Sequence, residues 1–381
     1  MSRSAGVVAA ALVAAVVAGA GEAAAQVIES EQARFRIVTL AEGLNQPWSL
    51  AFLPDGRMLV TEKRGVLRYI DTDGRLSPAI AGVPEVAAAG QGRLLDVAPH
   101  PDFASNQLIY FTYSGLAGSA SGTELARARL AGDRLENVEV LFSAEPKLIS
   151  AEPKLTSSKH FGSRIAFAPD GRVHVSLGDR GRRDEAQDVT SHLGSSIRLD
   201  DDGSVPDDNP FVRGGHLPET FTYGHRNMQG MAVNPWTGAV WAHEHGPKGG
   251  DEVNILKPGG NYGWPAITYG VEYSGAAITD ESARPGMEQP VLYWAPSIAP
   301  SGMAFYDGDR FAGWRGDLFV GALVGRHLRR IELDGDTAVG QEVLLAELGR
   351  RIRDVRAGPD GNLYVLSDGE GAVLLRLEPA E

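Results

Sequence analysis

One phrase returns along this sequence: a short apolar segment, a turn rich in Pro, Asp and Gly, and a second apolar segment. It reads SRIAFAPDGRVHVSLGD over 163–179 and IRDVRAGPDGNLYVLSD over 352–368, with looser copies elsewhere. Two strands joined by such a turn form a β-hairpin. The turns lie roughly 47 to 72 residues apart, near Pro54, Pro101, Pro169, Pro235, Asp307 and Pro359.

This spacing suits blades of four antiparallel strands separated by loops of variable length. Six hairpin units therefore predict an all-β chain, folded as a six-bladed β-propeller of four-stranded antiparallel blades around a central channel. A large β-sandwich is the alternative, but a sandwich does not need a repeat. No linker interrupts the chain, so we expect a single propeller domain over 26–381.

The first residues indicate export. They read MSRSAGVVAAALVAAVVAGAGEAAAQ, with Arg3 ahead of an apolar stretch and small residues before Gln26. This pattern predicts a signal peptide over 1–25 and a periplasmic or secreted protein with no membrane insertion after cleavage; a retained anchor is the alternative. The formal net charge of -13 argues against nucleic-acid binding, and with no cysteine the chain forms neither disulfides nor thiolate metal sites.

The repeat also predicts where a site lies. Residues just before the first strand of each blade share one mouth of the channel. Counting back about eight to ten positions from each turn, to within two residues, and adding Trp294 as a neighbour of Ser297, gives a polar, cationic and aromatic set, where a structural channel would more often be lined by small or apolar residues. The set contains Gln46, Trp48, Gln91, His160, Arg226, Asn227, Trp294, Ser297, Arg351 and Arg353.

His160 is the candidate general base of this set, because a neutral imidazole accepts protons near neutral pH. Taken alone it would more often be a surface or capping residue. Asp179, at the end of the following strand, either fixes the tautomer of His160 or caps the glycine-rich turn around Gly178 and Gly181. The residues leave these two roles of Asp179 open.

The stretch from Gly224 to Pro265 combines an Arg-Asn pair with a turn at Gly246-Pro247 and an acidic pair, Asp251-Glu252. Carbonyl oxygens and carboxylates are the ligands that calcium prefers, and arginine holds anions. Three arginines near one channel mouth also require an anion to neutralise them, such as a small polycarboxylate or a phosphate. The stretch indicates a metal and an anionic ligand held together; the alternative is a glycine-rich surface loop with solvated charges.

Several spaced motifs together resemble the soluble quinoprotein glucose/sorbosone dehydrogenases, the PQQ-dependent aldose sugar dehydrogenases. The resemblance runs from about residue 43 to 377. It rests on GQGRLLDVAPHPDF, KHFGSRIAFAPDG, GDRGR, DDGSVPDDNPF, GHRNMQG, HEHGPKGGDEVN, GGNYGWP, PSIAPSGMAFY and RIRDVRAGPDGNLYVLSD. It implies a six-bladed propeller with PQQ and calcium over the channel.

The resemblance also implies roles for the site residues. His160 is the expected base, oriented by Asp179, and Gln91 is a polar wall of the substrate site. The expected cofactor contacts are Arg226, Asn227, Arg351, Arg353 and an aromatic, Trp294. The expected calcium ligands are the carbonyls of Gly246 and Pro247, with Asp251 and Glu252 near a further calcium. One departure is Val324, which stands where the family has a cofactor-binding lysine.

The implied reaction oxidises an aldose at C1 to the lactone. His160 removes the anomeric proton, hydride passes to the quinone, and Arg226 stabilises the developing charge. The electron acceptor is unknown, and we expect a monomer or homodimer. The alternatives are a calcium-dependent lactonase, which would need carboxylate ligands instead of arginines at the mouth, and a non-catalytic propeller that binds a glycan or a partner.

Overall fold

The structure is a computed structural model, and it describes residues 27–87, 90–149 and 158–380. The predicted signal peptide over 1–25 lies outside these residues. Among the described residues, no helix is both long enough and apolar enough to cross a membrane.

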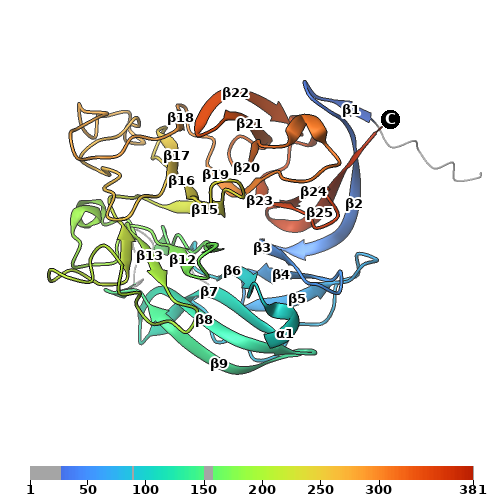
Figure 1. Cartoon of the computed structure of the whole chain (residues 1–381), viewed down its shortest axis with the longest axis horizontal. Helices are drawn as coiled ribbons and strands as arrows, with labels where there is room; N and C mark the ends of the chain where they lie inside the picture. The colour runs from blue at the N-terminus through green and yellow to red at the C-terminus, as the bar shows by residue number, and fades with distance from the viewer. Residues whose placement is uncertain (1–26, 88–89, 150–157, 381) are drawn as a thin grey trace, which may run out of the picture.

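Six antiparallel sheets surround a central axis, so the predicted six-bladed propeller is confirmed (Figure 1). The first sheet has three strands: β3 (Pro47–Phe52), β4 (Met58–Glu62) and β5 (Val66–Ile70). The second has five: β6 (Leu94–Pro99), β7 (Leu108–Ala117), β8 (Ala120–Ala131), β9 (Arg134–Ser143) and β10 (Leu148–Ile149). A short helix, α1 (Phe103–Asn106), lies between β6 and β7.

The third, fourth and fifth sheets have the four strands that the repeat predicted. The third contains β11 (Ile165–Phe167), β12 (Val173–Ser176), β13 (Ser196–Leu199) and β14 (Thr220–Thr222). The fourth contains β15 (Met228–Val233), β16 (Val240–Glu244), β17 (Asp251–Ile255) and β18 (Leu292–Trp294). The fifth contains β19 (Pro300–Phe305), β20 (Leu318–Ala322), β21 (Leu328–Asp334) and β22 (Thr337–Leu344).

The sixth sheet joins the two ends of the described chain. It contains β23 (Ile352–Ala357), β24 (Leu363–Ser367), β25 (Glu370–Pro379), β2 (Arg34–Asn45) and β1 (Val27–Glu29). In Figure 1 the blue strand β2 lies beside the red strand β25. This pairing closes the ring of blades, because the last blade takes its outer strands from the start of the described chain.

In each sheet, the strand named first above is the inner strand, which faces the channel. These inner strands contact one another in the order β3, β6, β11, β15, β19, β23 and back to β3. Each turn marked by the sequence repeat lies between the inner strand and the second strand of its blade. The repeat therefore predicted the inner strands correctly.

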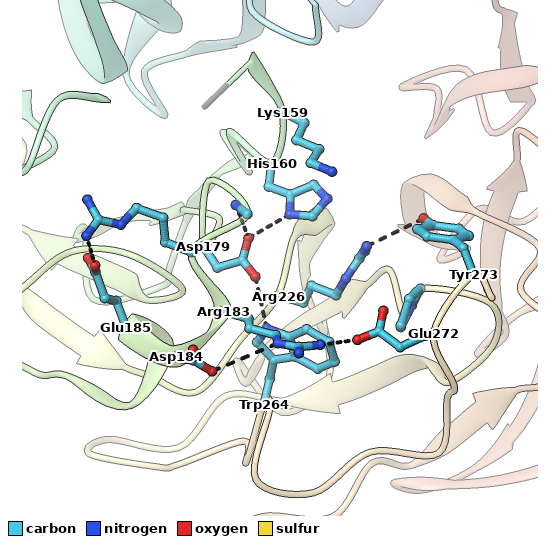
Figure 2. Close-up of a pocket in the computed structure, with 13 residues that line it drawn as sticks. Lys159, His160, Asp179, Arg183, Asp184, Glu185, Arg226, Trp264, Glu272 and Tyr273 are labelled. Atoms are coloured by element: carbon cyan, nitrogen blue, oxygen red, sulfur yellow. Dashed lines mark hydrogen bonds and ion pairs between the residues drawn. The ribbon is translucent and has the colours of Figure 1, made fainter. Parts of the chain in front are cut away.

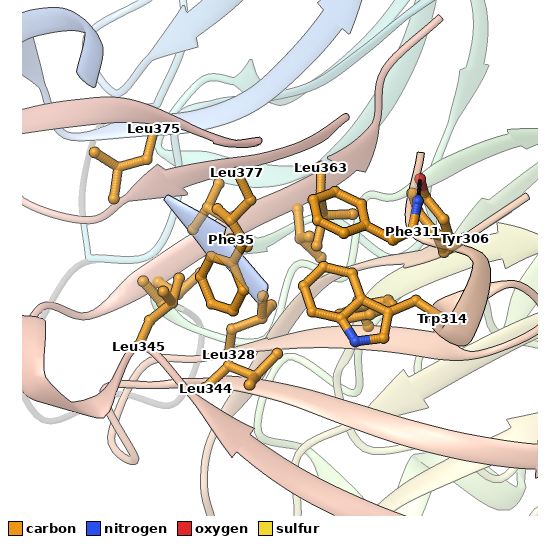
Figure 3. Packing of buried hydrophobic residues seen from close by; sticks show 14 of the residues in the cluster. Phe35, Tyr306, Phe311, Trp314, Leu328, Leu344, Leu345, Leu363, Leu375 and Leu377 are labelled. Carbon is orange, nitrogen blue, oxygen red and sulfur yellow. Dashed lines mark hydrogen bonds between the residues drawn. The ribbon is translucent and has the colours of Figure 1, made fainter. Parts of the chain in front are cut away.

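Apolar side chains hold the closing strand against the fifth and sixth blades. Phe35 of β2 is fully buried and packs edge-on against Trp314, with ring centroids 5.5 Å apart. Leu377 of β25 and Leu363 of β24 lie in the same cluster (Figure 3). Burial of large apolar side chains stabilises a fold by roughly 1.5–3 kcal/mol each, so this cluster opposes opening of the ring.

The channel itself is filled by charged side chains instead of apolar ones. Arg164 is buried, with ion pairs of 3.3 Å to Asp96 and 3.0 Å to Asp354. Arg356 contacts the same two carboxylates at 3.1 and 3.0 Å. Because each buried charge faces opposite charges, the desolvation cost is compensated. The Arg164 guanidinium also lies 4.1 Å from the ring of Trp48, which links these charged side chains to the mouth of the channel.

Candidate active site

A cavity of about 590 Å³ opens at the mouth of the channel (Figure 2). We call it the His160 cavity; His160, Asp179, Arg226 and Trp264 are among the residues that line it. His160 and Arg226 precede the inner strands β11 and β15, and Asp179 follows β12. Residues that the repeat placed at one end of separate blades therefore do meet in one cavity.

His160 and Asp179 form a buried pair. Nδ1 of His160 lies 2.6 Å from Oδ1 of Asp179. Asp179 also accepts hydrogen bonds from the Gly181 N–H at 2.6 Å and from Nε1 of Trp264 at 2.9 Å. An ionised carboxylate only accepts, so Nδ1 carries the proton and Nε2 is left with its lone pair. Asp179 thus combines the two roles that the sequence left open, because it contacts both the imidazole and the turn.

The main chain of His160 is held in an unusual conformation. Its φ of +58° lies in the left-handed region, which costs free energy for a residue with a Cβ atom. The His160 N–H donates to Oε1 of Gln91 at 2.7 Å. Such backbone strain is kept where surrounding contacts enforce it, often at functional sites.

Burial governs the protonation of the pair. Burial lowers the pKa of His160 below its usual value; hydrogen bonding and charge from Asp179 oppose this effect, while the charge of Arg226 adds to it. Burial would raise the pKa of Asp179, but the hydrogen bond and charge of His160, the charge of Arg226 and the Gly181 N–H together outweigh burial and lower the pKa. Asp179 alone would raise the pKa of His160, but burial is the larger effect and the net direction is downward. The imidazole is therefore neutral at neutral pH, as a general base must be.

Arg226 is a buried cation without a carboxylate partner among the residues that the structure describes. Its guanidinium donates to the carbonyl of His245 at 3.1 Å and to the hydroxyl of Tyr273 at 3.5 Å. It also lies 5.6 Å from the ring of Trp264. Within the described ranges it forms no ion pair. A buried guanidinium in this state favours an anion, or a group that becomes negative during a reaction.

A second cavity of about 320 Å³ adjoins the first, and we call it the arginine cavity. Phe161 and Asn227, which line it, directly follow His160 and Arg226 in the chain. Its other lining residues include Gln46, Trp48, Gln91, Arg93, Arg351, Arg353 and Asp368. The sequence prediction that Gln91, Asn227, Arg351 and Arg353 gather at one mouth agrees with this geometry.

Asp368 neutralises part of this cationic charge. Its two carboxylate oxygens lie 2.8 Å from Nε of Arg351 and 2.9 Å from a terminal nitrogen of Arg353. Burial would raise the pKa of Asp368, but the nearby charges of Arg353 and Arg351 outweigh it and lower the pKa. The sequence reasoning required an external anion for these arginines and missed this internal one.

The predicted metal residues divide into two groups. Gly246 and Pro247 are buried in a turn after β16, and no donor in the described part of the chain bonds to their carbonyl oxygens. Pro247 lines the His160 cavity. Asp251, in contrast, has both oxygens engaged, by the N–H groups of Gly246, Ile298 and Ala299 and by the hydroxyl of Ser297. Asp251 therefore orders the turn instead of offering free ligand atoms.

Glu252 faces Glu244 across the pairing of β16 with β17. Burial, and then the negative charge of Glu244, raise the pKa of Glu252 to about 8. The buried side-chain oxygen of the nearby Asn254 has no partner among the described residues. A cavity of about 10 Å³ beside the two glutamates has room for one water or ion. No group of three or more His, Cys, Asp or Glu suited to a metal occurs over the described ranges.

Trp294 does not lie where the sequence placed it. It belongs to β18, the outermost strand of its blade, and its Nε1 donates to Gln341 at 2.8 Å. It lines neither the His160 cavity nor the arginine cavity. The aromatic side chains that line the His160 cavity are Trp264, from the GGNYGWP segment, and Tyr273. Counting back from the hairpin turns could not identify Trp264, because this residue lies in the loop after β17 and not before an inner strand.

The fold and the site define a six-bladed propeller with a buried imidazole–carboxylate pair beside a cationic cavity. The family model for glucose / sorbosone dehydrogenase matches residues 44–376. The chain therefore belongs to the glucose/sorbosone dehydrogenase family, and it is an oxidoreductase that acts on the CH–OH groups of sugars.

Three relatives illustrate the similarity. The chain is 43% identical to the aldose sugar dehydrogenase YliI of Escherichia coli, over 91% of this chain and 94% of the relative. A crystal structure of a glucose dehydrogenase superposes with a TM-score of 0.87 at 48% identity, covering 90% of this chain and 99% of that one. The PQQ-bound aldose sugar dehydrogenase of Streptomyces coelicolor superposes with a TM-score of 0.74 at 29% identity, covering 91% and 99%.

Proposed function

We propose that this protein is a PQQ- and calcium-dependent aldose dehydrogenase that oxidises the sugar at C1 to the lactone. One observation carries the proposal: a neutral His160, held by Asp179, shares a cavity with the buried and unpaired cation Arg226. The relative from Streptomyces coelicolor, which is bound to PQQ, supports the choice of cofactor.

The arginine cavity suits the quinone. PQQ is a small tricarboxylate, and arginine forms planar, paired contacts with carboxylates. Arg351 and Arg353 both line this cavity, and Asp368 is the one carboxylate among the described lining residues. Arg226 and Asn227 would hold the ring system at the border of the two cavities. When bound, the quinone supplies the acceptor for two electrons.

The turn at Gly246 and Pro247 suits calcium, because no donor among the described residues bonds to the two carbonyl oxygens, and Pro247 lines the His160 cavity. A Cβ atom on Gly246 would lie 1.9 Å from the carbonyl oxygen of Gly249. The turn is therefore a tight fold of main chain that only glycine permits at this position. Glu252, with Asn254, would hold a further calcium, whose charge would offset the repulsion between Glu252 and Glu244.

In the reaction, Nε2 of His160 would accept the proton of the anomeric hydroxyl while C1 loses a hydride, and the negative charge that develops on the sugar oxygen becomes the second bond of the lactone carbonyl. Asp179 keeps the imidazole in the tautomer that exposes Nε2 and stabilises the imidazolium that forms. The unpaired charge of Arg226 stabilises negative charge that develops beside it. Trp264 fixes the carboxylate of Asp179 and so the orientation of the base.

The compartment and the other partners follow from the sequence. The predicted leader supports a periplasmic or secreted enzyme, and a small aldose is the proposed substrate. A reduced cofactor must pass its electrons to an acceptor, whose identity we leave open. A monomer or a homodimer is compatible with the proposed chemistry.

The test is reconstitution of the apo-protein with PQQ and calcium, followed by addition of an aldose and an artificial electron acceptor. We expect the acceptor to be reduced only when all components are present, and to find the lactone as product. The His160→Ala variant, loaded to the same extent with PQQ, is the matched control. A wild-type protein that hydrolyses lactones without PQQ, and does not oxidise aldoses with it, contradicts the proposal.

A further inference from the structure

Arg93 is a cation in the arginine cavity to which the sequence reasoning gave no role. It directly precedes the inner strand β6 and lines the cavity together with Arg351 and Arg353. Its main chain is fixed, because the carbonyl of Arg93 accepts hydrogen bonds from the N–H and the hydroxyl of Ser114. The fixed main chain therefore directs the half-buried side chain of Arg93 to this cavity.

The side chain of Arg93 makes few polar contacts within the described residues. Its Nε donates to the carbonyl of Gln91 at 3.3 Å, and within the described residues it forms no ion pair. Burial, and then repulsion from Arg353, lower its pKa to about 10, so the guanidinium stays charged at neutral pH. The arrangement places one more positive charge beside two arginines that already share Asp368.

The charges of the cavity do not balance. The described lining holds three guanidinium groups and one carboxylate, which leaves an excess of two positive charges. His245 adds none, because burial lowers its pKa to about 3. Repulsion among half-buried cations is unfavourable unless an anion of at least two charges occupies the space between them.

We propose that Arg93 binds a carboxylate of the quinone and supplies the third cation of the arginine cavity. This inference rests on the proposed function, which identifies the anion as PQQ. Val324, which the sequence resemblance placed at the position of a cofactor-binding lysine, has a side chain that is 64% exposed, and it is not among the described lining residues. Arg93 provides the cationic contact that Val324 does not.

The experiment measures binding of PQQ to the apo-protein at equilibrium, by fluorescence quenching, with calcium and without sugar. Loss of one charge-assisted hydrogen bond weakens binding on the order of 10- to 100-fold, which we expect for Arg93→Gln. Arg93→Lys keeps the charge and should lose less affinity. Arg64→Gln is the matched control, because Arg64 is an exposed arginine outside the cavity and its loss changes the net charge equally.

The trimethyl ester of PQQ separates carboxylate binding from a structural effect. Arg93→Gln should bind the ester as well as the wild type does, and its thermal midpoint without cofactor should not fall, because the variant loses a cation that repels Arg353. Equal PQQ affinity of Arg93→Gln and the wild type overturns the inference and leaves the proposed function intact. An equal loss for PQQ and its ester assigns Arg93 a structural role and overturns the inference. A wild-type protein that does not bind PQQ overturns both.

Discussion

The main-chain N–H of His160 donates a hydrogen bond of 2.7 Å to the side-chain oxygen of Gln91, 69 positions earlier in the chain. Gln91 lines the arginine cavity, whereas His160 lines the His160 cavity. The bond therefore connects the two cavities. It also helps to keep His160 at its left-handed φ of +58°. This contact gives Gln91 a positioning role, where the sequence suggested a wall of the substrate site.

We expect Gln91→Leu to lower kcat about tenfold with little change in KM for the sugar, because the base is misplaced while the sugar contacts remain. Gln91→Glu keeps the acceptor oxygen and should lose less. Steady-state kinetics at saturating PQQ provide the measurement. Gln46→Leu is the matched control, since Gln46 lines the same cavity and makes no side-chain hydrogen bond to His160. A raised KM at unchanged kcat would instead support the substrate-wall role.

His160 should account for a large part of the rate. We expect His160→Ala to keep the propeller fold and PQQ affinity and to lose on the order of 10² to 10⁴ in kcat, the usual contribution of a positioned general base. Circular dichroism and PQQ titration check the fold and the loading. An alanine variant that is loaded and oxidises aldoses at the wild-type rate would require another base.

The pH dependence follows from the pKa of His160. The neutral imidazole is the active form, so kcat/KM should rise with pH and reach a plateau above the apparent pKa. Burial lowers that pKa below 6.5, so the plateau should already be reached near neutral pH. Asp179→Asn removes the charge that opposes this lowering, and should shift the midpoint further down while it slows the reaction. An upward shift in the asparagine variant would contradict this account.

The fold could be predicted from the sequence because each hairpin is encoded by a short, local sequence motif. Each turn is encoded by a few adjacent residues, and six copies define six inner strands. The same logic predicted that His160 and Arg226 meet, since both occupy the same phase of separate repeats. Site residues that come before an inner strand are therefore accessible to sequence reasoning.

The site residues that could not be predicted, or were predicted in the wrong place, do not lie just before an inner strand. Asp368 follows the second strand of its blade, and it reaches Arg351 and Arg353 only because antiparallel pairing returns β24 to the start of β23. Trp264 reaches Asp179 from a long loop. Trp294 joined the predicted set only as a neighbour of Ser297, and it lies on the outer strand β18.

Asp368 should stabilise the apo-protein. Asp368→Asn leaves two neighbouring guanidinium groups without their shared counter-charge, and we expect the free energy of unfolding to fall by about 2 kcal/mol. Urea denaturation of the apo-protein measures this change. Because PQQ itself neutralises the arginines, saturating PQQ should reduce the difference between variant and wild type. An equal difference with and without PQQ would indicate that the cofactor does not contact these arginines.

Calcium should be required for tight PQQ binding. The carbonyl oxygens of Gly246 and Pro247 have no donors in the described part of the chain, and one ion could join them to the quinone. We expect a chelator to weaken PQQ binding, measured by titration of the apo-protein with and without added calcium. Equal affinity in both conditions would contradict a calcium contact between protein and cofactor.

Two variants separate the two proposed calcium positions. Gly246→Ala should abolish the effect of calcium on PQQ affinity, because its Cβ would lie 1.9 Å from the Gly249 carbonyl oxygen and the turn must shift. Glu252→Gln should keep that effect but lose the rise in thermal midpoint that calcium gives the apo-protein, since a ligand that binds the folded state stabilises it. If Glu252→Gln instead abolishes the calcium effect on PQQ affinity, the two positions act as one site.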